Sequence, residues 1–222
     1  MIDVSACNGR EPLSIAIDVP GGYVALPLTD IAGSVSRAES VFAEIGPGPV
    51  SSAAPAVLQA LKVLLTRATQ LNAVYCGLGR HSAADGQTIS STLIVSVHEY
   101  GERKNPRLAL ADVLTARTSD GGTFENIEMI QVSGRPILLL DRVRELPAPD
   151  FPDRTSESAV AKVYQLEAVV SATDGTAIAA VECSTSSVEY GEEFVPMIAA
   201  MAASVEFVTS AASSRAPSSL DL

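Results

Sequence analysis

Apolar and polar residues alternate between Leu13 and Val19, and this period of two predicts a half-buried strand. A Pro-Gly-Gly turn ends the strand, and the letters YVALPL predict a second short extended segment. From Asp30 the apolar residues recur at helical spacing until GPGP at 46–49 interrupts the pattern. A second helix is predicted to begin within Ser52 to Pro55. Its apolar stripe is wide enough to predict cover on more than one side.

Three hairpins are predicted further along the chain. In the first, Asp85-Gly86 supplies the positive φ angles of a two-residue turn. That loop sets three apolar pairs opposite each other: Val74 with Val97, Cys76 with Val95, and Leu78 with Leu93. All three pairs share one face of the sheet, which predicts the register of the hairpin.

The second hairpin turns at Ser133-Gly134, and the apolar run RPILLLDRV predicts a central strand. The third turns at Asp174-Gly175. Its register is predicted to pair Val170 with Ala179, Ala168 with Val181, Leu166 with Cys183, and Glu167 with Glu182.

Two further helices complete the predicted elements. Asn105-Pro106 caps a short helix that continues to Arg117. Glu192 and Glu193 favour a helix N-terminus, and Phe194, Ile198, Met201 and Val205 predict an amphipathic helix that follows them. The expected organisation is a flexible N-terminus over 1–11, a single α+β domain over 12–208, and a disordered tail over 209–222. The expected fold is one antiparallel sheet of hairpins with helices packed on it, an α/β/α sandwich.

Composition and charge limit the classes of partner that the protein is expected to bind. With 47% hydrophobic and 18% charged residues among 222, the chain can build its core without disulfides or a structural metal. The net charge of −11 disfavours nucleic acid and anionic membrane surfaces as partners. The three cysteines are not clustered, no signal peptide is legible, and no stretch is expected to approach the roughly 20 apolar residues of a membrane span. These features predict a cytoplasmic protein.

The order of elements resembles a known family. A strand that ends in a Pro-Gly turn with an aromatic residue (VPGGYVALPL) leads through helices and hairpins to the closing segment FVPMIAAMAASVEF. This order is similar to the PsbP-like sandwich, a group that includes photosystem II accessory proteins and Ran-binding nuclear transport factors. YVALPL is also similar to actinobacterial proteins of unknown function, some encoded beside type VII secretion genes. The resemblance covers 12 to 208 and implies an accessory or partner-binding role, with no functional residue matched by a motif.

His81 and His98 are the only histidines, so histidine-based catalysis must use one of them. The predicted register sets His81 opposite Ser90 and His98 on the same face as Ser96. A Ser-His pair is therefore feasible. However, no GxSxG motif is present, and no carboxylate is placed by spacing to orient either imidazole. The sequence therefore favours two surface histidines on strands, without a catalytic role.

Other candidate chemistry is sparse. Glu167 and Glu182 could share a proton or hold a cation, although exposed glutamates can also splay into water. Neither the cysteines nor the aspartates have metal-ligand spacing, and the glycine-rich segments lack phosphate-loop spacing, so no cofactor is expected. Cys76 and Cys183 are predicted to be inert buried thiols.

One loop carries a candidate partner-binding site. Phe151 lies between Asp150 and Asp153 in PDFPD, which would hold an aromatic side chain in an acidic extended segment. It could enter a partner's pocket or fold back as a plug on the sandwich.

The sequence therefore favours a non-enzymatic accessory or chaperone-like protein that binds another protein and has a link to type VII secretion. The alternative is a small-molecule binder or hydrolase with a Ser/His pocket between sheet and helices. A third interpretation is a homodimer formed through an open sheet edge.

Overall fold

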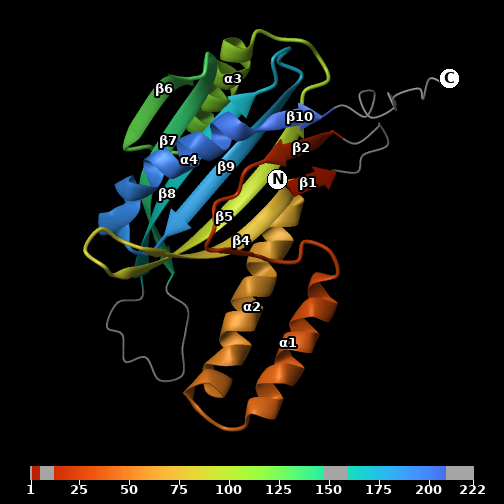
Figure 1. The fold of residues 1–222 in the computed structure, drawn as a ribbon, viewed down its shortest axis with the longest axis vertical. Helices are drawn as coiled ribbons and strands as arrows, with labels where there is room; N and C mark the ends of the chain where they lie inside the picture. Colours follow the sequence, from red (N-terminus) through yellow and green to blue (C-terminus); the bar gives the residue numbers. More distant parts are fainter. Residues whose placement is uncertain (1, 6–12, 148–159, 209–222) are drawn as a thin grey trace, which may run out of the picture.

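The fold is built on one seven-stranded antiparallel sheet (Figure 1). The computed structural model describes residues 2–5, 13–147 and 160–208. The strand order is β3-β4-β5-β9-β8-β7-β6, so each of the three predicted hairpins forms a neighbouring pair. In this order the strands are Tyr23–Ala25, Ala73–Ser82, Thr88–Glu99, Ala177–Thr185, Val160–Ser171, Arg135–Pro147 and Asn126–Val132.

Helices cover both faces of this sheet, which confirms the α+β sandwich. On one face lie the 3-10 helix η1 (Val188–Phe194) and α4 (Val195–Ser204), over the larger apolar core. On the other face α3 (Pro106–Ser119) covers a smaller core, and its Asn105 cap accepts a hydrogen bond from the Arg107 backbone nitrogen at 2.9 Å. The run Ile137 to Leu140 in β7 is buried on both sides, and β7 is an interior strand, as predicted.

A small second sheet joins segments from both ends of the described chain. It is formed by β1 (Ile2–Ser5), β2 (Ser14–Ile17) and β10 (Glu206–Val208), with β2 in the centre. Within the predicted N-terminal segment 1–11, residues 2–5 pair antiparallel with β2. The predicted closing helix ends at Ser204, because its last carbonyls accept hydrogen bonds from Arg135 and the chain then pairs with β2. The predicted tail, 209–222, lies outside the described residues.

Of the two predicted hairpin registers, that of β8–β9 is confirmed and that of β4–β5 is wrong, and the predicted β6–β7 turn is confirmed. The pairs Leu166–Cys183 and Glu167–Glu182 lie opposite each other as expected, and β6 and β7 turn at Ser133-Gly134. In the β4–β5 hairpin, however, Leu78 pairs with Thr92 and Cys76 with Ile94.

The error arises from the length of the β4–β5 loop. The Ala83 nitrogen donates to the Gln87 carbonyl, so the loop has three residues, with Gly86 at φ 85° in the left-handed region. A shift of one residue moves every side chain to the other face. As a result Leu93 is completely buried, whereas Leu78 is 43% exposed on the opposite face.

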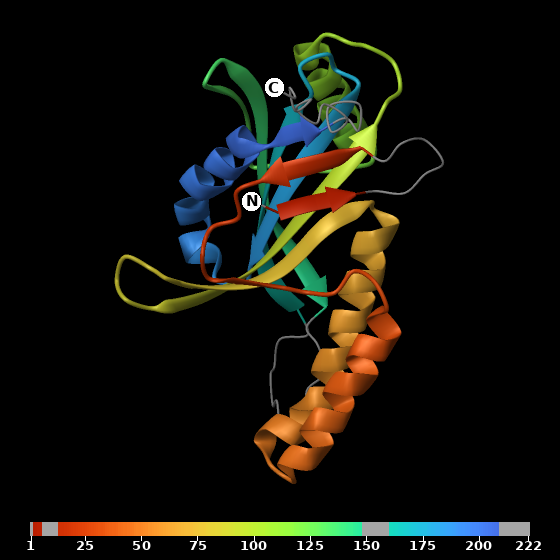
Figure 2. The same ribbon diagram turned by 45° about the vertical axis from the view of Figure 1, so that its right-hand side comes forward.

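The helices α1 (Ile31–Ile45) and α2 (Pro49–Gln70) form an antiparallel hairpin that projects away from the sheet (Figure 2). Helix α2 begins at Pro49, earlier than predicted, because proline is well suited to the first helical turn. Its apolar stripe was predicted to be covered on more than one side, but Val57 and Leu71 remain exposed.

Helix α2 also corrects the expectation about membrane spans. Within the described ranges it is the one helix that is long and apolar enough to cross a membrane by length and composition. This property follows from its 22 residues, which include only two charged side chains, Lys62 and Arg67.

The closing helix provides a test of the larger core. Ile198 on α4 has no exposed surface, so Ile198→Asp would bury a charge without a partner and should unfold the protein. Leu108 on α3 is 62% exposed, so Leu108→Asp is the matched control and should leave the melting temperature nearly unchanged. Thermal unfolding followed by circular dichroism measures both. A cooperative transition for Ile198→Asp at the wild-type temperature would contradict this assignment of the core.

The corrected β4–β5 register is tested by two alanine substitutions. Leu93→Ala should lower the free energy of unfolding by about 2–5 kcal/mol, because it leaves a cavity in the core. Leu78→Ala should lower it by less than about 1 kcal/mol, because Leu78 is half exposed. Since the two side chains lie on opposite faces, urea denaturation of the double variant should give additive losses. A coupling energy above about 0.5 kcal/mol would instead support the register in which Leu78 and Leu93 face each other.

Candidate binding surface

The loop predicted to bind a partner, with Asp150, Phe151 and Asp153, lies outside the described residues. Its role therefore stays a prediction. The described residues carry four other features of interest: a Ser-His pair, a carboxylate pair, a groove across the sheet, and an apolar face of the helical hairpin.

Ser91 links His81 to Tyr23 on the α4 side of the sheet. Its Oγ lies 2.9 Å from His81 Nε2 and 3.0 Å from the Tyr23 hydroxyl. The imidazole also meets the Phe194 ring edge-on at 5.3 Å between centroids. Gly79 is required here, because a Cβ at this position would collide with His81, Tyr23 and Ser91. The predicted Ser-His pair therefore exists, but with a different serine.

The difference follows from the register of β4 and β5. Ser90 lies opposite Arg80 and faces the other side of the sheet, while His98 pairs with Ile178 on the α3 side. The two histidines, predicted to share a face, are thus on opposite faces. Burial lowers the pKa of each.

The Ser91–His81 pair has the contacts of a structural bridge. Ser91 is only 5% exposed, and no carboxylate is hydrogen-bonded to His81 among the described residues. A catalytic serine needs access to substrate and a base that a third group orients. The neutral imidazole and the two hydroxyls satisfy one another within the core, which explains why these polar groups can be buried.

The carboxylates of Glu167 and Glu182 lie opposite each other on the α3 side, as predicted. Arg117 on α3 donates to Glu167 at 2.7 Å, and Gln165 donates to Glu182 at 3.3 Å. Burial, followed by the neighbouring Glu167, raises the pKa of Glu182. Glu167 does not splay into water, because its carboxylate is held in an ion pair with Arg117.

The described residues contain no cluster of three His, Cys, Asp or Glu side chains that could hold a metal ion. Cys76 and Cys183 are buried, as predicted, and burial raises the pKa of each thiol to about 11. Thiols with pKa values this high are protonated at neutral pH and are poor nucleophiles.

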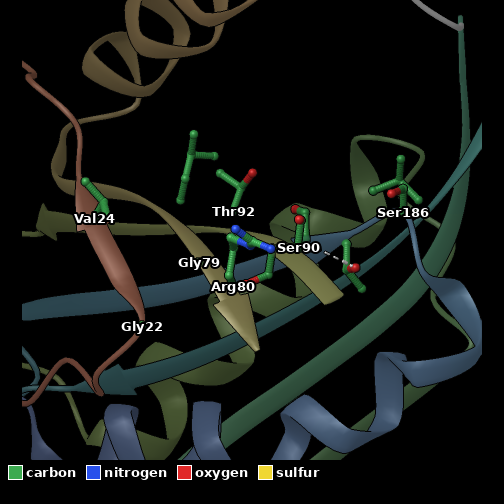
Figure 3. Close-up of a pocket in the computed structure, with 12 residues that line it drawn as sticks. Gly22, Val24, Gly79, Arg80, Ser90, Thr92 and Ser186 are labelled. Carbon is green, nitrogen blue, oxygen red and sulfur yellow. Dashed lines mark hydrogen bonds between the residues drawn. The ribbon is translucent and has the colours of Figure 1, made fainter. Parts of the chain in front are cut away.

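A groove of about 650 Å³ crosses the part of the sheet that α3 leaves uncovered (Figure 3). Val24 on β3 stands at one side, and Arg80, Ser90 and Thr92 line the centre. Arg80 is the only charged residue among the described residues that line it. The groove thus offers hydroxyl groups, apolar surface and one cation on the face opposite the Ser91–His81 pair.

The helical hairpin exposes a second kind of surface. Val50, Val57 and Leu64 on α2, and Leu71 directly after its end, recur every seven residues, beside the buried residues Leu58 and Leu65. On α1, Val41 and Ile45 are displaced from the helix contact in the same rotational sense. In an antiparallel pair, rows displaced in the same sense lie on the same side. Together these six residues form what we call the hairpin face.

The large apolar side chains of the hairpin face are unusually exposed. Five of its six members are 46% to 62% exposed, namely Leu71, Val57, Val41, Val50 and Ile45. Soluble monomers rarely expose contiguous apolar patches without a binding role. Helix α2 contributes Lys62 and Arg67 and no acidic residue, whereas α1 carries Arg37, Glu39 and Glu44, so the basic charge of the hairpin lies on α2.

Comparisons with known proteins bear on the fold alone. No family model matches the chain, and no curated protein matches it. Among solved structures, the chain is similar to the solution structure of cyanobacterial PsbP (CyanoP) from Synechocystis sp. PCC 6803, at 11% identity and a TM-score of 0.36. The match covers 91% of this chain and 98% of that one. The α+β class rests on the strands and helices of this chain, and no functional residue is transferred.

Sequence reasoning missed the hairpin face, although a signal for it was present. The spacing of Val50, Val57, Leu64 and Leu71 by seven residues is typical of a helix that packs against other helices. The same residues would also be expected in a helix that is covered on several sides, and the sequence analysis interpreted the apolar stripe of the second helix in that way. Only the arrangement of α1, α2 and the sheet shows that this side is open.

The two half-buried histidines, His81 and His98, predict a pH dependence of stability. Because their folded pKa values lie below 6.5, the unfolded chain binds protons more readily than the folded one. Their contribution is fully present above about pH 6.5 and is lost as the pH falls through the lowered values. The raised pKa of Glu182 acts in the opposite direction, so the measurement must compare wild type with His81→Gln/His98→Gln.

In urea denaturation between about pH 7 and 5, wild type should lose more stability than this double variant. Parallel curves for the two proteins would show that the histidines do not titrate differently in the folded and unfolded states.

Proposed function

We propose that this protein is a non-enzymatic accessory module that binds a partner protein through the hairpin face. The observation that carries the proposal is the exposure of this contiguous apolar row on two helices that project away from the sheet. A surface on a projecting element can dock without disturbing the core of the domain. The cytoplasmic location, which rests on the three unclustered cysteines, and the link to type VII secretion, which rests on the sequence resemblance, belong to the same proposal.

The geometry of the face favours an amphipathic helix as its occupant. Two antiparallel helices with apolar rows on one side form a groove into which a third helix can pack, with its own apolar residues spaced three and four apart. Arg67 borders the α2 row near the sheet, so acidic residues on the partner helix would complement it. The expected partner segment is therefore an acidic amphipathic helix.

The alternative function, a small-molecule binder, is favoured by the groove across the sheet. Its apolar walls and single arginine suit a small amphipathic anion. The hydrolase version of this alternative would require the Ser91 hydroxyl to become accessible, because it now lies in the core on the opposite face. We therefore place the groove second.

The proposal predicts that a charge on the hairpin face abolishes partner binding without unfolding the protein. Val57→Asp should change the free energy of unfolding by less than about 1 kcal/mol, because Val57 is 48% exposed. Gln59→Asp adds the same charge on the opposite side of α2 and is the matched control. Size-exclusion chromatography with light scattering first establishes whether the face pairs with a second copy.

A photo-crosslinking amino acid at residue 57, and at residue 59 as control, then identifies neighbours in the native cells. The proposal expects a protein crosslinked from residue 57 only, whose binding is lost with Val57→Asp and kept with Gln59→Asp. It is wrong if the same partner binds both variants equally. It is also wrong if the hairpin pairs only with itself or inserts into lipid vesicles.

A further inference from the structure

The two edges of the seven-stranded sheet differ in how they are protected against pairing with another strand. At one edge β3 has only three residues, and Pro27 follows shortly after it. At the other edge β6 has seven residues and pairs only with β7 among the described strands (Figure 1). Proteins usually protect an edge strand by shortening it, by a bulge, or by a proline or lysine. β6 has no proline or lysine, and its register against β7 has no bulge.

The turn of the β6–β7 hairpin decides which backbone groups of β6 are free. Ser133 and Gly134 have φ angles of 51° and 79°, so they form a two-residue turn of the primed type. Such a turn closes on a hydrogen-bonded pair, here Val132 and Arg135, and bonded and non-bonded pairs then alternate along the ladder. The β6 residues of the non-bonded pairs direct their N–H and C=O groups away from β7. These residues are Ile127, Met129 and Gln131.

The side chains beside these free backbone groups are exposed. They lie on the α3 side of the sheet, because Met129 pairs with Leu138, which belongs to the smaller core. Ile127 is 49% exposed and Met129 is 46% exposed. The outer edge of β6 therefore combines free donors and acceptors with apolar surface. An extended strand satisfies both, because it supplies a ladder of backbone groups and alternating side chains.

β6 is complementary to itself in one antiparallel register. With Met129 at a two-fold axis, all seven residues of one β6 strand pair with all seven of another. The outward-directed residues of the two strands then face each other, and each facing pair can exchange two hydrogen bonds. Ile127 and Met129 of both copies form one apolar cluster across the axis. A register centred on Glu128 is disfavoured, because it sets two carboxylates directly opposite each other.

We propose that β6 pairs with β6 of a second copy of this chain, about a two-fold axis at Met129, and joins two seven-stranded sheets into one. The pairing uses the long edge of each copy. The edges that remain are the three-residue β3 strands, which are too short to extend the sheet, so assembly stops at a dimer. β6 and the hairpin face belong to different elements, so the inference holds or fails independently of the proposed function.

Sedimentation equilibrium at physiological ionic strength, where much of the net charge of −11 is screened, tests this inference. Wild type should show an equilibrium between monomer and dimer. Met129→Pro removes an outward-directed N–H and leaves the bonds to β7 in place, so it should weaken the dimer about tenfold or more. Ala25→Pro is the matched control on β3, where the Leu26 nitrogen, and not that of Ala25, donates to Cys76. It should dimerise like wild type.

A second variant guards against a proline that disturbs the hairpin. Met129→Lys keeps the backbone N–H and places two like charges opposite each other at the axis. It should also weaken the dimer about tenfold or more, while circular dichroism shows the wild-type fold. Val57→Asp on the hairpin face should leave the dimer unchanged. Loss of the dimer with Val57→Asp alone would assign self-association to the hairpin face and overturn the inference.

Cysteine crosslinking tests the register. Facing residues of a bonded pair have Cα atoms about 5.5 Å apart, within the range of a disulfide. Under mild oxidation Met129→Cys should therefore form a covalent dimer faster than Gln131→Cys, which would face Ile127 of the second copy, and faster than wild type.

The inference is overturned if wild type is monomeric up to about 100 μM or forms species larger than a dimer. It is also overturned if both Met129→Pro and Met129→Lys dimerise as tightly as wild type, if Ala25→Pro weakens the dimer as much as Met129→Pro, or if the two cysteine variants crosslink equally fast.

Discussion

Burial on both faces of the central strands is the constraint on which the rest of the structure depends. In β7, the four consecutive residues Ile137 to Leu140 are all buried, and successive residues of a strand point to opposite faces. The neighbouring strands β8 and β9 are also buried on both faces, as Val169 and Ala180 show together with the buried residues that precede them. Such strands are stable only if both faces are covered, so the chain must supply helices on each side. η1 and α4 cover one face and α3 covers the other.

The lengths of these elements decide where polar chemistry can lie. Helix α3 has 14 residues and spans roughly 21 Å, whereas the 12 residues of β8 span roughly 40 Å. One helix therefore covers about half the length of the strands on its side. Beyond its end, Gln165, Glu167 and Glu182 replace apolar residues, and the groove opens over Thr92 and Ser184. The polar side chains of this face therefore gather at and beyond the end of α3.

Charge is distributed unevenly over this framework. The chain carries 26 acidic and 15 basic residues, yet the groove is lined by one arginine and α2 has only basic charges. An acidic cavity where β6 and β7 meet the beginning of α4 lies at the other extreme: it is lined by Glu125, Glu128, Asp141 and Glu192, with no cation among its described lining residues. A protein with regions of opposite charge can attract different ligands to each region, and it suppresses binding in the wrong place. The hairpin and the acidic cavity are therefore suited to different occupants.

The sequence by itself determined the class of fold and most of its elements, because these depend on local periodicity. Alternation over Leu13 to Val19 and the apolar pairs of the β8–β9 hairpin predicted strands and a register that the structure confirms. The β4–β5 register was decided by Gly86 in a three-residue loop, which the Asp-Gly dipeptide alone does not distinguish from a two-residue turn. The strand pairing of residues 2–5 and 206–208 arises only because both segments meet β2, far away in the sequence. Whether Val57 is core or surface likewise depends on which elements pack beside it, and no local pattern contains that information.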